Sequence, residues 1–180
     1  MSFNEQEILA KLQDPSTQRR AFAEVVNQYS ETLYWQIRRM VVDHEDANDV
    51  LQNTLVKAWT SIGSFRGEAK LSTWLFRIAY HESLTFLEHK KQNISIDDVS
   101  SEVSNQLESD PYFDGDETQA MLQAAIETLP AKQKAVFNMK YFEEKTYEEI
   151  SAITGTSVGA LKASYHIAIE KISHFFDTHD

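Results

Sequence analysis

Apolar residues recur every three or four positions along most of the chain, which is the spacing of amphipathic helices. In the first half this pattern predicts a short helix over 5–12 that ends before Pro15, and longer helices over about 17–42, 46–62 and 72–91. Short connections join these helices, and amphipathic helices connected in this way are typical of a compact bundle.

The helix expected over 46–62 has one apolar side, and Gly63 follows its last residue. The loop SFRGEAKLS then leads to the next helix, in which Trp74 is spaced with Leu71 and Ile78 as a core residue. The core residues predicted on the helix over 46–62 are Val50, Leu51, Leu55, Ala58, Trp59 and Ile62.

A cluster of acidic residues, DHEDAND, stands where the helix over 46–62 begins. Carboxylates at this position accept hydrogen bonds from free amides of the first turn and favour the positive end of the helix. We therefore expect Asp43, Asp46 and Asp49 to act as caps and first-turn charges, and we predict no metal site at them or at His44.

The second half of the chain predicts further helices. Apolar residues between Met121 and Leu129 indicate a helix that stops before Pro130, and a second helix is expected over about 131–142. Prolines stand at predicted boundaries, where the missing amide hydrogen is tolerated. No pattern of alternating residues predicts a strand, so the expected fold class is all-α.

The stretch from Thr146 to Ile172 predicts a short helix, a tight turn and a longer helix. Thr146 and Glu149 form a T-x-x-E capping box, and Gly155 suits a left-handed turn. Thr156 or Ser157 is expected to cap the longer helix, whose predicted buried stripe is Val158, Leu161, Tyr165, Ala168 and Ile172. The pattern is typical of a helix-turn-helix that binds DNA, and equally of a plain helical hairpin.

The acidity of the chain is concentrated in one segment. The formal net charge is −11, and residues 93–118 hold 8 acidic and no basic residues. The segment is rich in Ser, Asp, Glu and Asn, and we interpret residues 93–116 as a flexible acidic linker. The flanking parts are close to neutral, so the negative total does not exclude local basic faces that bind nucleic acid.

Composition excludes several other classes. The chain has no cysteine, which rules out disulfide and thiolate-metal frameworks. Its start lacks a signal-peptide pattern, and no stretch approaches a membrane span, so we expect a soluble cytoplasmic protein without membrane insertion. No phosphate loop, H-E-x-x-H motif or nucleophile motif is present. We expect no enzyme activity, no cofactor and no metal.

Two long motifs resemble a known family. DANDVLQNTLVKAWTSIGSF, continued by FRGEAKLSTWLFRIAY, is similar to conserved region 2 of bacterial RNA polymerase sigma factors. LPAKQKAVFNMKYFEEKTYEEISAITGTSVGALK is similar to their region 4. The resemblance is closest to the extracytoplasmic-function (ECF) group of the sigma-70 family. It implies a region-2 bundle over 1–92, which joins through the linker to a region-4 domain over 117–180.

The resemblance also implies site residues and partners. The partners would be core RNA polymerase, the −35 and −10 elements of promoter DNA, and an anti-sigma protein. The polymerase-binding residues would be Asp49, Gln52, Asn53 and Lys57. Capture of the −10 strand would use Phe65, Phe76, Tyr80 and His81, with Lys70, Arg77, Lys90 and Lys91 toward phosphates. The −35 duplex would be read by Ser157, Gly159, Ala160, Lys162, Ala163, His166 and Ile167.

The sequence departs from the family pattern in both domains. Ser164 and Ile167 stand where arginines are common in the second helix of the helix-turn-helix, and His81 replaces a frequent asparagine in region 2. One bidentate arginine contact to guanine contributes ~1–3 kcal/mol of discrimination. The implied promoter element is therefore richer in methyl contacts, or DNA affinity comes mainly through polymerase.

Two other functions fit the pattern of helices without the family. A free-standing helix-turn-helix regulator would bind duplex DNA without polymerase, and such regulators commonly form dimers on paired half-sites. A helical interaction module with weakened DNA binding would fit the missing arginines. Run-off transcription with purified core polymerase separates both from a sigma factor.

Overall fold

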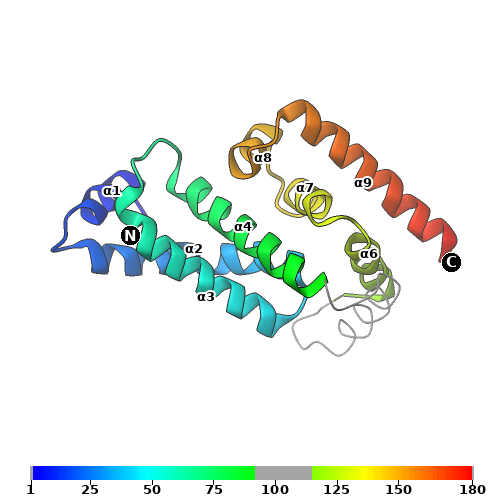
Figure 1. Ribbon diagram of the computed structural model, residues 1–180, viewed down its shortest axis with the longest axis horizontal. Coiled ribbons are helices and arrows are strands. Elements are labelled where there is room, and N and C mark those ends of the chain that lie inside the picture. Colours follow the sequence, from blue (N-terminus) through cyan, green and yellow to red (C-terminus); the bar gives the residue numbers. More distant parts are fainter. Residues whose placement is uncertain (1, 92–114, 180) are drawn as a thin grey trace.

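The computed structural model describes residues 2–91 and 115–179. All regular structure in these ranges is helical, which confirms the all-α prediction. The helices form two groups: α1 to α4 come from the first half of the chain, and α6 to α9 from the second (Figure 1). Most of the predicted linker lies outside the described residues; of it, Asp116 caps helix α6 by accepting a hydrogen bond from the Gln119 amide at 2.9 Å.

Three long helices, α2, α3 and α4, make up most of the first group. Helix α1 spans Glu5–Gln13, α2 spans Gln18–Val41, α3 spans His44–Ser61 and α4 spans Leu71–Lys91, with a short 3₁₀ turn η1 at Ile62–Ser64. These bounds lie within two residues of the predicted ones, apart from the 3₁₀ turn. Helices α2, α3 and α4 pack on one another, and α1 packs on the first part of α2.

The acidic cluster before α3 caps the helix as expected. The Asp43 carboxylate accepts a hydrogen bond from the Asp46 amide at 3.1 Å, and Glu45 and Asp46 lie in the first turn. The hydrogen bond satisfies a free amide of the first turn, and the negative charges are favourable at the positive end of the helix. Among the described residues no group of histidines, aspartates and glutamates is arranged to hold a metal ion.

One predicted core residue of α3 reaches the surface. Trp59 is 38% exposed, although its ring lies 5.1 Å from that of Phe22. Trp74 packs against the core and is half-buried, as the sequence predicts. An indole is large enough to bury one edge and leave the other in water, so its spacing alone does not fix its exposure.

The second group carries the predicted helix-turn-helix. Helix α6 spans Glu117–Glu127, α7 spans Ala131–Tyr141, α8 spans Tyr147–Thr154 and α9 spans Val158–Thr178. Helix α9 packs on α6, α7 and α8 (Figure 1). Within the second group, Ala125, Ile126, Phe137, Ala168 and Ile172 belong to one hydrophobic cluster.

The turn between α8 and α9 forms as the sequence predicts. The Thr146 hydroxyl accepts a hydrogen bond from the Glu149 amide at 3.1 Å, which caps α8. Gly155 ends α8 with φ +77°, a left-handed conformation that glycine adopts without steric cost. Ser157, rather than Thr156, caps α9 by accepting from the Ala160 amide at 3.3 Å.

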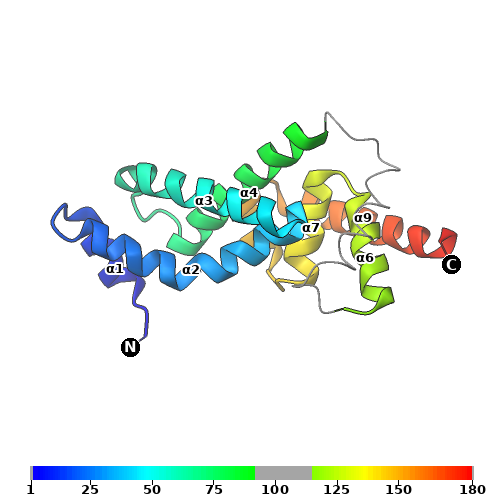
Figure 2. The same cartoon turned by 90° about the horizontal axis from the view of Figure 1, so that it is seen from below.

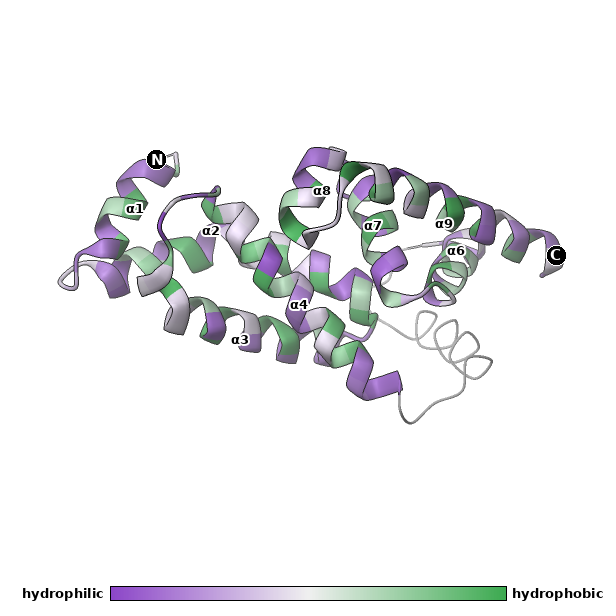
Figure 3. Cartoon of the chain, turned by 45° about the horizontal axis from the view of Figure 1, so that its top comes forward, coloured by the Kyte–Doolittle hydropathy of each residue, from purple (hydrophilic) through white to green (hydrophobic). Residues whose placement is uncertain are grey.

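The two groups are also packed against each other. Helix α8 lies on α4, and α7 lies next to the end of α2 (Figures 1 and 2). The largest hydrophobic cluster joins residues of both groups, among them Leu75 of α4 and Ile150 of α8. Apolar and polar residues alternate along the helices of both groups (Figure 3). This packing decides which of the predicted site residues are accessible.

Candidate nucleic-acid interface

The predicted −35 face lies along the exposed side of α9. It begins at the Ser157 cap, one residue after Thr156, and runs for about three turns. The buried stripe of α9, which includes Leu161, Ala168 and Ile172, lies on the other side of the helix. The predicted residues are all exposed: Ser157, Gly159, Ala160, Lys162, Ala163, His166 and Ile167.

Small side chains occupy the first turn of this face. A Cβ atom added at Gly159 would meet no other atom within 4 Å, so the position is open on the protein side. The free amides at the beginning of a helix favour a phosphate group. Lys162, the long cation on this face, lies with its Nζ 5.8 Å from the ring centroid of Tyr147. The face combines a cation and helix-start amides with room for a close backbone approach.

The positions that lack the family's arginines differ in accessibility. Ile167 is 42% exposed, whereas Ser164 is half-buried. His166 lies beside Ile167, and its Nε2 atom is 3.2 Å from a carboxylate oxygen of Glu170. Of the two replaced positions, only Ile167 is exposed to solvent.

The aromatic residues predicted for −10 capture are buried in this structure. Phe65 is 9% exposed and its ring lies 5.0 Å from that of Trp74. Phe76 and Tyr80 are 8% and 4% exposed, and burial raises the pKa of the Tyr80 hydroxyl. His81 is exposed, and a nitrogen of its ring lies 2.9 Å from the Arg77 carbonyl oxygen.

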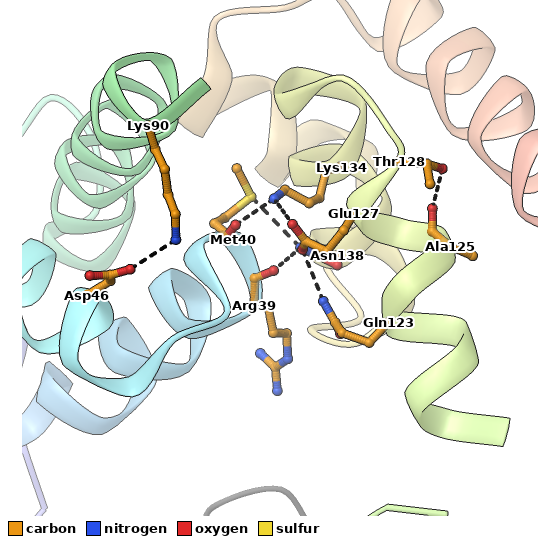
Figure 4. Close-up of polar contacts among 10 residues, drawn as sticks. All are labelled: Arg39, Met40, Asp46, Lys90, Gln123, Ala125, Glu127, Thr128, Lys134 and Asn138. Carbon is orange, nitrogen blue, oxygen red and sulfur yellow. Dashed lines mark hydrogen bonds and ion pairs between the residues drawn. The ribbon is translucent and has the colours of Figure 1, made fainter. Parts of the chain in front are cut away.

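The basic residues predicted for the −10 strand fall into different environments. Lys70 and Lys91 are exposed at the two ends of α4. Lys90 is half-buried, and its Nζ lies 3.2 Å from the Asp46 carboxylate (Figure 4). Arg77 donates hydrogen bonds from Nε and Nη2 to the Ala152 carbonyl oxygen of α8, at 3.2 and 2.9 Å.

The predicted polymerase-binding residues share the exposed side of α3. Asp49, Gln52, Asn53 and Lys57 are all exposed, and Lys57 forms an ion pair with Glu82 of α4. Sequence reasoning missed Val56 on this side, which is 62% exposed.

The signal that would have found Val56 is its position in the helix. It stands three residues after Asn53 and seven after Asp49, so it falls on their side of α3 and away from the core residues Val50 and Ala58. Val56 is thus an exposed apolar side chain among polar ones on this side of α3.

An open pocket lies at the edge of the contact between the helix groups. The pocket has a volume of about 320 Å³. The Arg39 guanidinium lies 6.0 Å from the ring centroid of Trp35 and 5.3 Å from that of Phe142, between the two aromatic side chains. The pocket is lined by Glu31, Thr32, Trp35, Arg39, Phe142, Glu143 and Lys145.

In the described part of the chain, no helix is long and apolar enough to cross a membrane.

Comparison with known families matches both helix groups. The family described as Sigma-70 region 2 matches residues 25–93, and the family described as Sigma-70, region 4 matches residues 119–172. The first match covers α2 to α4 with only the start of α2 left out. The second covers the helix-turn-helix and the two helices before it.

Individual relatives match over most of their length. The ECF RNA polymerase sigma factor SigW of Bacillus subtilis is 30% identical over 81% of this chain and 83% of its own. The RNA polymerase sigma-H factor of Pseudomonas aeruginosa is 29% identical over 86% of this chain and 85% of its own.

Solved structures share the fold. CnrH, in complex with the cytosolic domain of CnrY, has a TM-score of 0.71 at 20% identity and covers 98% of this chain and 99% of its own. The sigma factor RpoE of Bartonella quintana, in complex with the anti-sigma factor NepR, has a TM-score of 0.64 at 20% identity and covers 88% of this chain and 98% of its own. With both family regions matched in order and SigW matched along most of its length, the chain belongs to the sigma-70 family of RNA polymerase sigma factors, in its extracytoplasmic-function group.

Proposed function

We propose that this sigma factor directs core RNA polymerase to promoters with a fixed division of labour between its helix groups. Helix α9 reads the −35 duplex. The loop before α4 and α4 itself capture the unpaired −10 strand, and the exposed side of α3 binds polymerase. The protein supplies recognition and has no catalytic chemistry of its own.

The observation that carries the proposal is the exposed face of α9. Each residue that the resemblance implies for −35 reading faces solvent, while the stripe of Leu161, Ala168 and Ile172 is buried beneath it. A recognition helix needs this arrangement, because its outer side enters the major groove while its inner side holds it on the domain. Lys162 is the cation on that face that can reach a phosphate.

The side of α3 formed by Asp49, Gln52, Asn53 and Val56 fits a contact with polymerase. It combines an exposed apolar side chain with surrounding polar groups. Buried apolar area supplies the association energy at such a surface, and polar groups at its rim fix the register.

An anti-sigma protein is a further proposed partner. RpoE of Bartonella quintana has been solved bound to the anti-sigma factor NepR. The present chain shares that fold, and the pocket of Trp35, Arg39 and Phe142 has the aromatic and arginine composition that is enriched at protein interfaces.

The proposal is tested by run-off transcription with purified core polymerase on genomic fragments. Specific initiation that requires the full chain is expected. A Lys162→Ala variant should then weaken promoter recognition and leave polymerase binding unchanged, with Lys171→Ala as the matched control on the same helix. Tight duplex binding without polymerase, together with no initiation in its presence, would instead identify a free-standing regulator.

A further inference from the structure

Helix α4 takes the acceptor for its first amide from a distant part of the chain. The Glu5 carboxylate, in the first turn of α1, accepts a hydrogen bond from the Leu71 amide, 66 positions later. The first turn of α4 has no acidic residue of its own, and the side chain of Lys70, directly before it, has no oxygen that could accept. A carboxylate at this end satisfies a free amide and is favourable beside the positive end of the helix.

Glu5 is held in position by contacts that do not use its carboxylate. The Asn4 side chain caps α1 by accepting a hydrogen bond from the Glu7 amide at 3.2 Å. Ile8 and Leu12, on the buried side of α1, are each 3% exposed and belong to the largest hydrophobic cluster. Helix α1 should therefore keep its place when the Glu5 carboxylate is removed.

Helix α1 contacts both ends of the loop between α3 and α4. It packs on the 3₁₀ turn η1, which leads into the loop, and Ile62 of that turn lies in the same hydrophobic cluster as Ile8 and Leu12. At the other end of the loop, Glu5 binds the first amide of α4. These contacts lie at the end of the first group that is remote from the second group (Figure 1). One helix thus fixes the two ends of the loop over 65–70 relative to each other.

The middle of this loop faces solvent. Arg66 and Glu68 are exposed, and between them Gly67 has φ +76°. The Phe65 ring lies 5.0 Å from that of Trp74, which holds the first residue of the loop against α4. A loop that is ordered before binding loses less conformational entropy when a base enters it, and it binds more tightly for that reason. The fixed ends therefore favour base capture.

We propose that Glu5 is a positioning residue for −10 recognition, because it fixes the start of α4 and with it the loop over 65–70 that captures an unpaired base. The inference rests on the assignment of this loop to the −10 strand in the proposed function. Glu5 touches no DNA in this role and acts through the Leu71 amide. Its removal should weaken capture of the base without weakening contacts to the phosphates of the strand or to the −35 duplex.

The first experiment tests the cap without DNA. Amide hydrogen exchange in the full chain, followed by NMR, compares the natural protein with Glu5→Ala and Glu5→Gln variants. In Glu5→Ala the Leu71 amide should exchange at least roughly tenfold faster, the factor expected for loss of a hydrogen bond to a charged group. Glu5→Gln keeps an acceptor oxygen without the charge, so its exchange rate should lie between the two.

Glu7→Ala is the matched control for this experiment, because Glu7 is exposed in the same turn of α1. Its Leu71 amide should exchange as in the natural protein. The amide of Ala79, in the buried middle of α4, should be unchanged in all variants. Unchanged exchange at Leu71 in Glu5→Ala would overturn the cap. Equal acceleration along the whole of α4 would identify a general loss of stability and would overturn the local role.

The second experiment tests the effect on base capture. The probe is a single-stranded −10 oligonucleotide, from a promoter mapped by run-off transcription, bound by the complex with core polymerase. Each nucleotide in turn is replaced by an abasic one, which keeps the phosphates and removes the base. The captured base is the one whose removal weakens binding to the natural protein most, by roughly 5- to 150-fold for a stacked base.

Glu5→Ala should bind the intact oligonucleotide roughly two- to thirtyfold more weakly than the natural protein, which is the range for loss of a helix cap. It should bind the oligonucleotide that lacks the captured base as well as the natural protein does, so the penalty for removing that base becomes smaller. Glu5→Gln should restore part of the penalty, and Glu7→Ala should equal the natural protein. Binding of a −35 duplex should be the same for all of them.

An equal loss on the intact and abasic oligonucleotides would mean that Glu5 acts on stability or on phosphate contacts, and would overturn the positioning role. Unweakened binding of the intact strand by Glu5→Ala would overturn it too. A Gly67→Val variant distorts the loop itself, because a β-branched residue rarely adopts a positive φ. If this variant leaves the penalty unchanged, the assignment of the loop in the proposed function fails and the positioning role with it, while the exchange experiment still decides whether Glu5 caps α4.

Discussion

Replacing Ile167 by arginine tests which missing arginine of the recognition helix matters. Ile167 is 42% exposed on the proposed −35 face, so a longer charged side chain meets no core residue there. Ser164, the other replaced position, is half-buried. The Ile167→Arg variant should therefore fold normally and add a second long cation to the face that carries Lys162.

The expected change in the salt dependence of DNA affinity follows from the number of phosphate contacts. Each added contact steepens the dependence of log affinity on log salt by about 0.9 for duplex DNA. Between 50 and 200 mM salt, the affinity of the variant should therefore fall by roughly 3.5-fold more than that of the natural protein, because the variant makes one more phosphate contact. At low salt the variant should bind more tightly than the natural protein. If the arginine reaches a guanine edge instead, it adds ~1–3 kcal/mol of preference for that base.

The assay is a salt titration of promoter binding by the complex of the variant with core polymerase. Ala23→Arg is the matched control: it adds the same charge at an exposed position of α2, outside the proposed −35 face. A steeper salt dependence for Ile167→Arg alone is expected. If both variants steepen it equally, added charge acts non-specifically and the assignment of the face is refuted.

Three further predictions concern stability and polymerase binding. Gly155→Ala should destabilise the protein by roughly 1–2 kcal/mol because Gly155 has φ +77°. Gly159→Ala, in the first turn of α9 with equal space for a Cβ, should instead be neutral or stabilising by less than ~1 kcal/mol; urea unfolding compares the two, and equal effects would contradict the conformational explanation. Burial raises the pKa of Glu143, against the opposing charges of Lys145 and Arg39, so the folded state keeps a proton that the unfolded chain releases. The contribution of Glu143 to the stability of the folded protein is therefore fully present below the unfolded-state pKa and is lost as pH rises through the folded-state pKa. In the Glu143→Gln variant, the melting temperature should change less with pH above about pH 4.5. An unchanged pH profile in the variant would argue against this origin. Val56→Glu should weaken binding to core polymerase with no change in melting temperature, while Ala23→Glu, exposed on α2, should not; equal binding by both variants would contradict a contact at Val56.

The periodic parts of the fold could be predicted from sequence because each helix has its own local signals. The Thr146 cap, the left-handed Gly155 and the carboxylate of Asp43 act within a few residues of themselves, and the structure confirms all three. The buried stripe of α9 follows from the helical period for the same reason. Family resemblance supplied the roles, which the helical pattern alone left open.

The contact between the helix groups could not be predicted, because its parts are far apart in the chain. From the sequence, Lys134 would be expected to be an ordinary surface lysine. In the structure its Nζ donates a hydrogen bond to the carbonyl of Met40, 94 positions earlier. The sequence likewise predicts that Phe76 is available to a base, yet Phe76 lies in the hydrophobic cluster that joins the two groups, with the Lys145 Nζ of the other group 4.1 Å from its ring centroid. The prediction of Trp59 as core was wrong because the period gives the side of the helix without the depth of burial.

The shared hydrophobic cluster has a consequence for the lifetime of the protein. Leu75 and Ile150 belong to one continuous set of buried side chains, so separating the helix groups exposes apolar surface on each of them. The two groups should then melt together in one cooperative transition. The contact would therefore limit how often apolar segments on the facing sides of the two groups are exposed to proteases, and the abundance of the protein would depend on how often the contact opens.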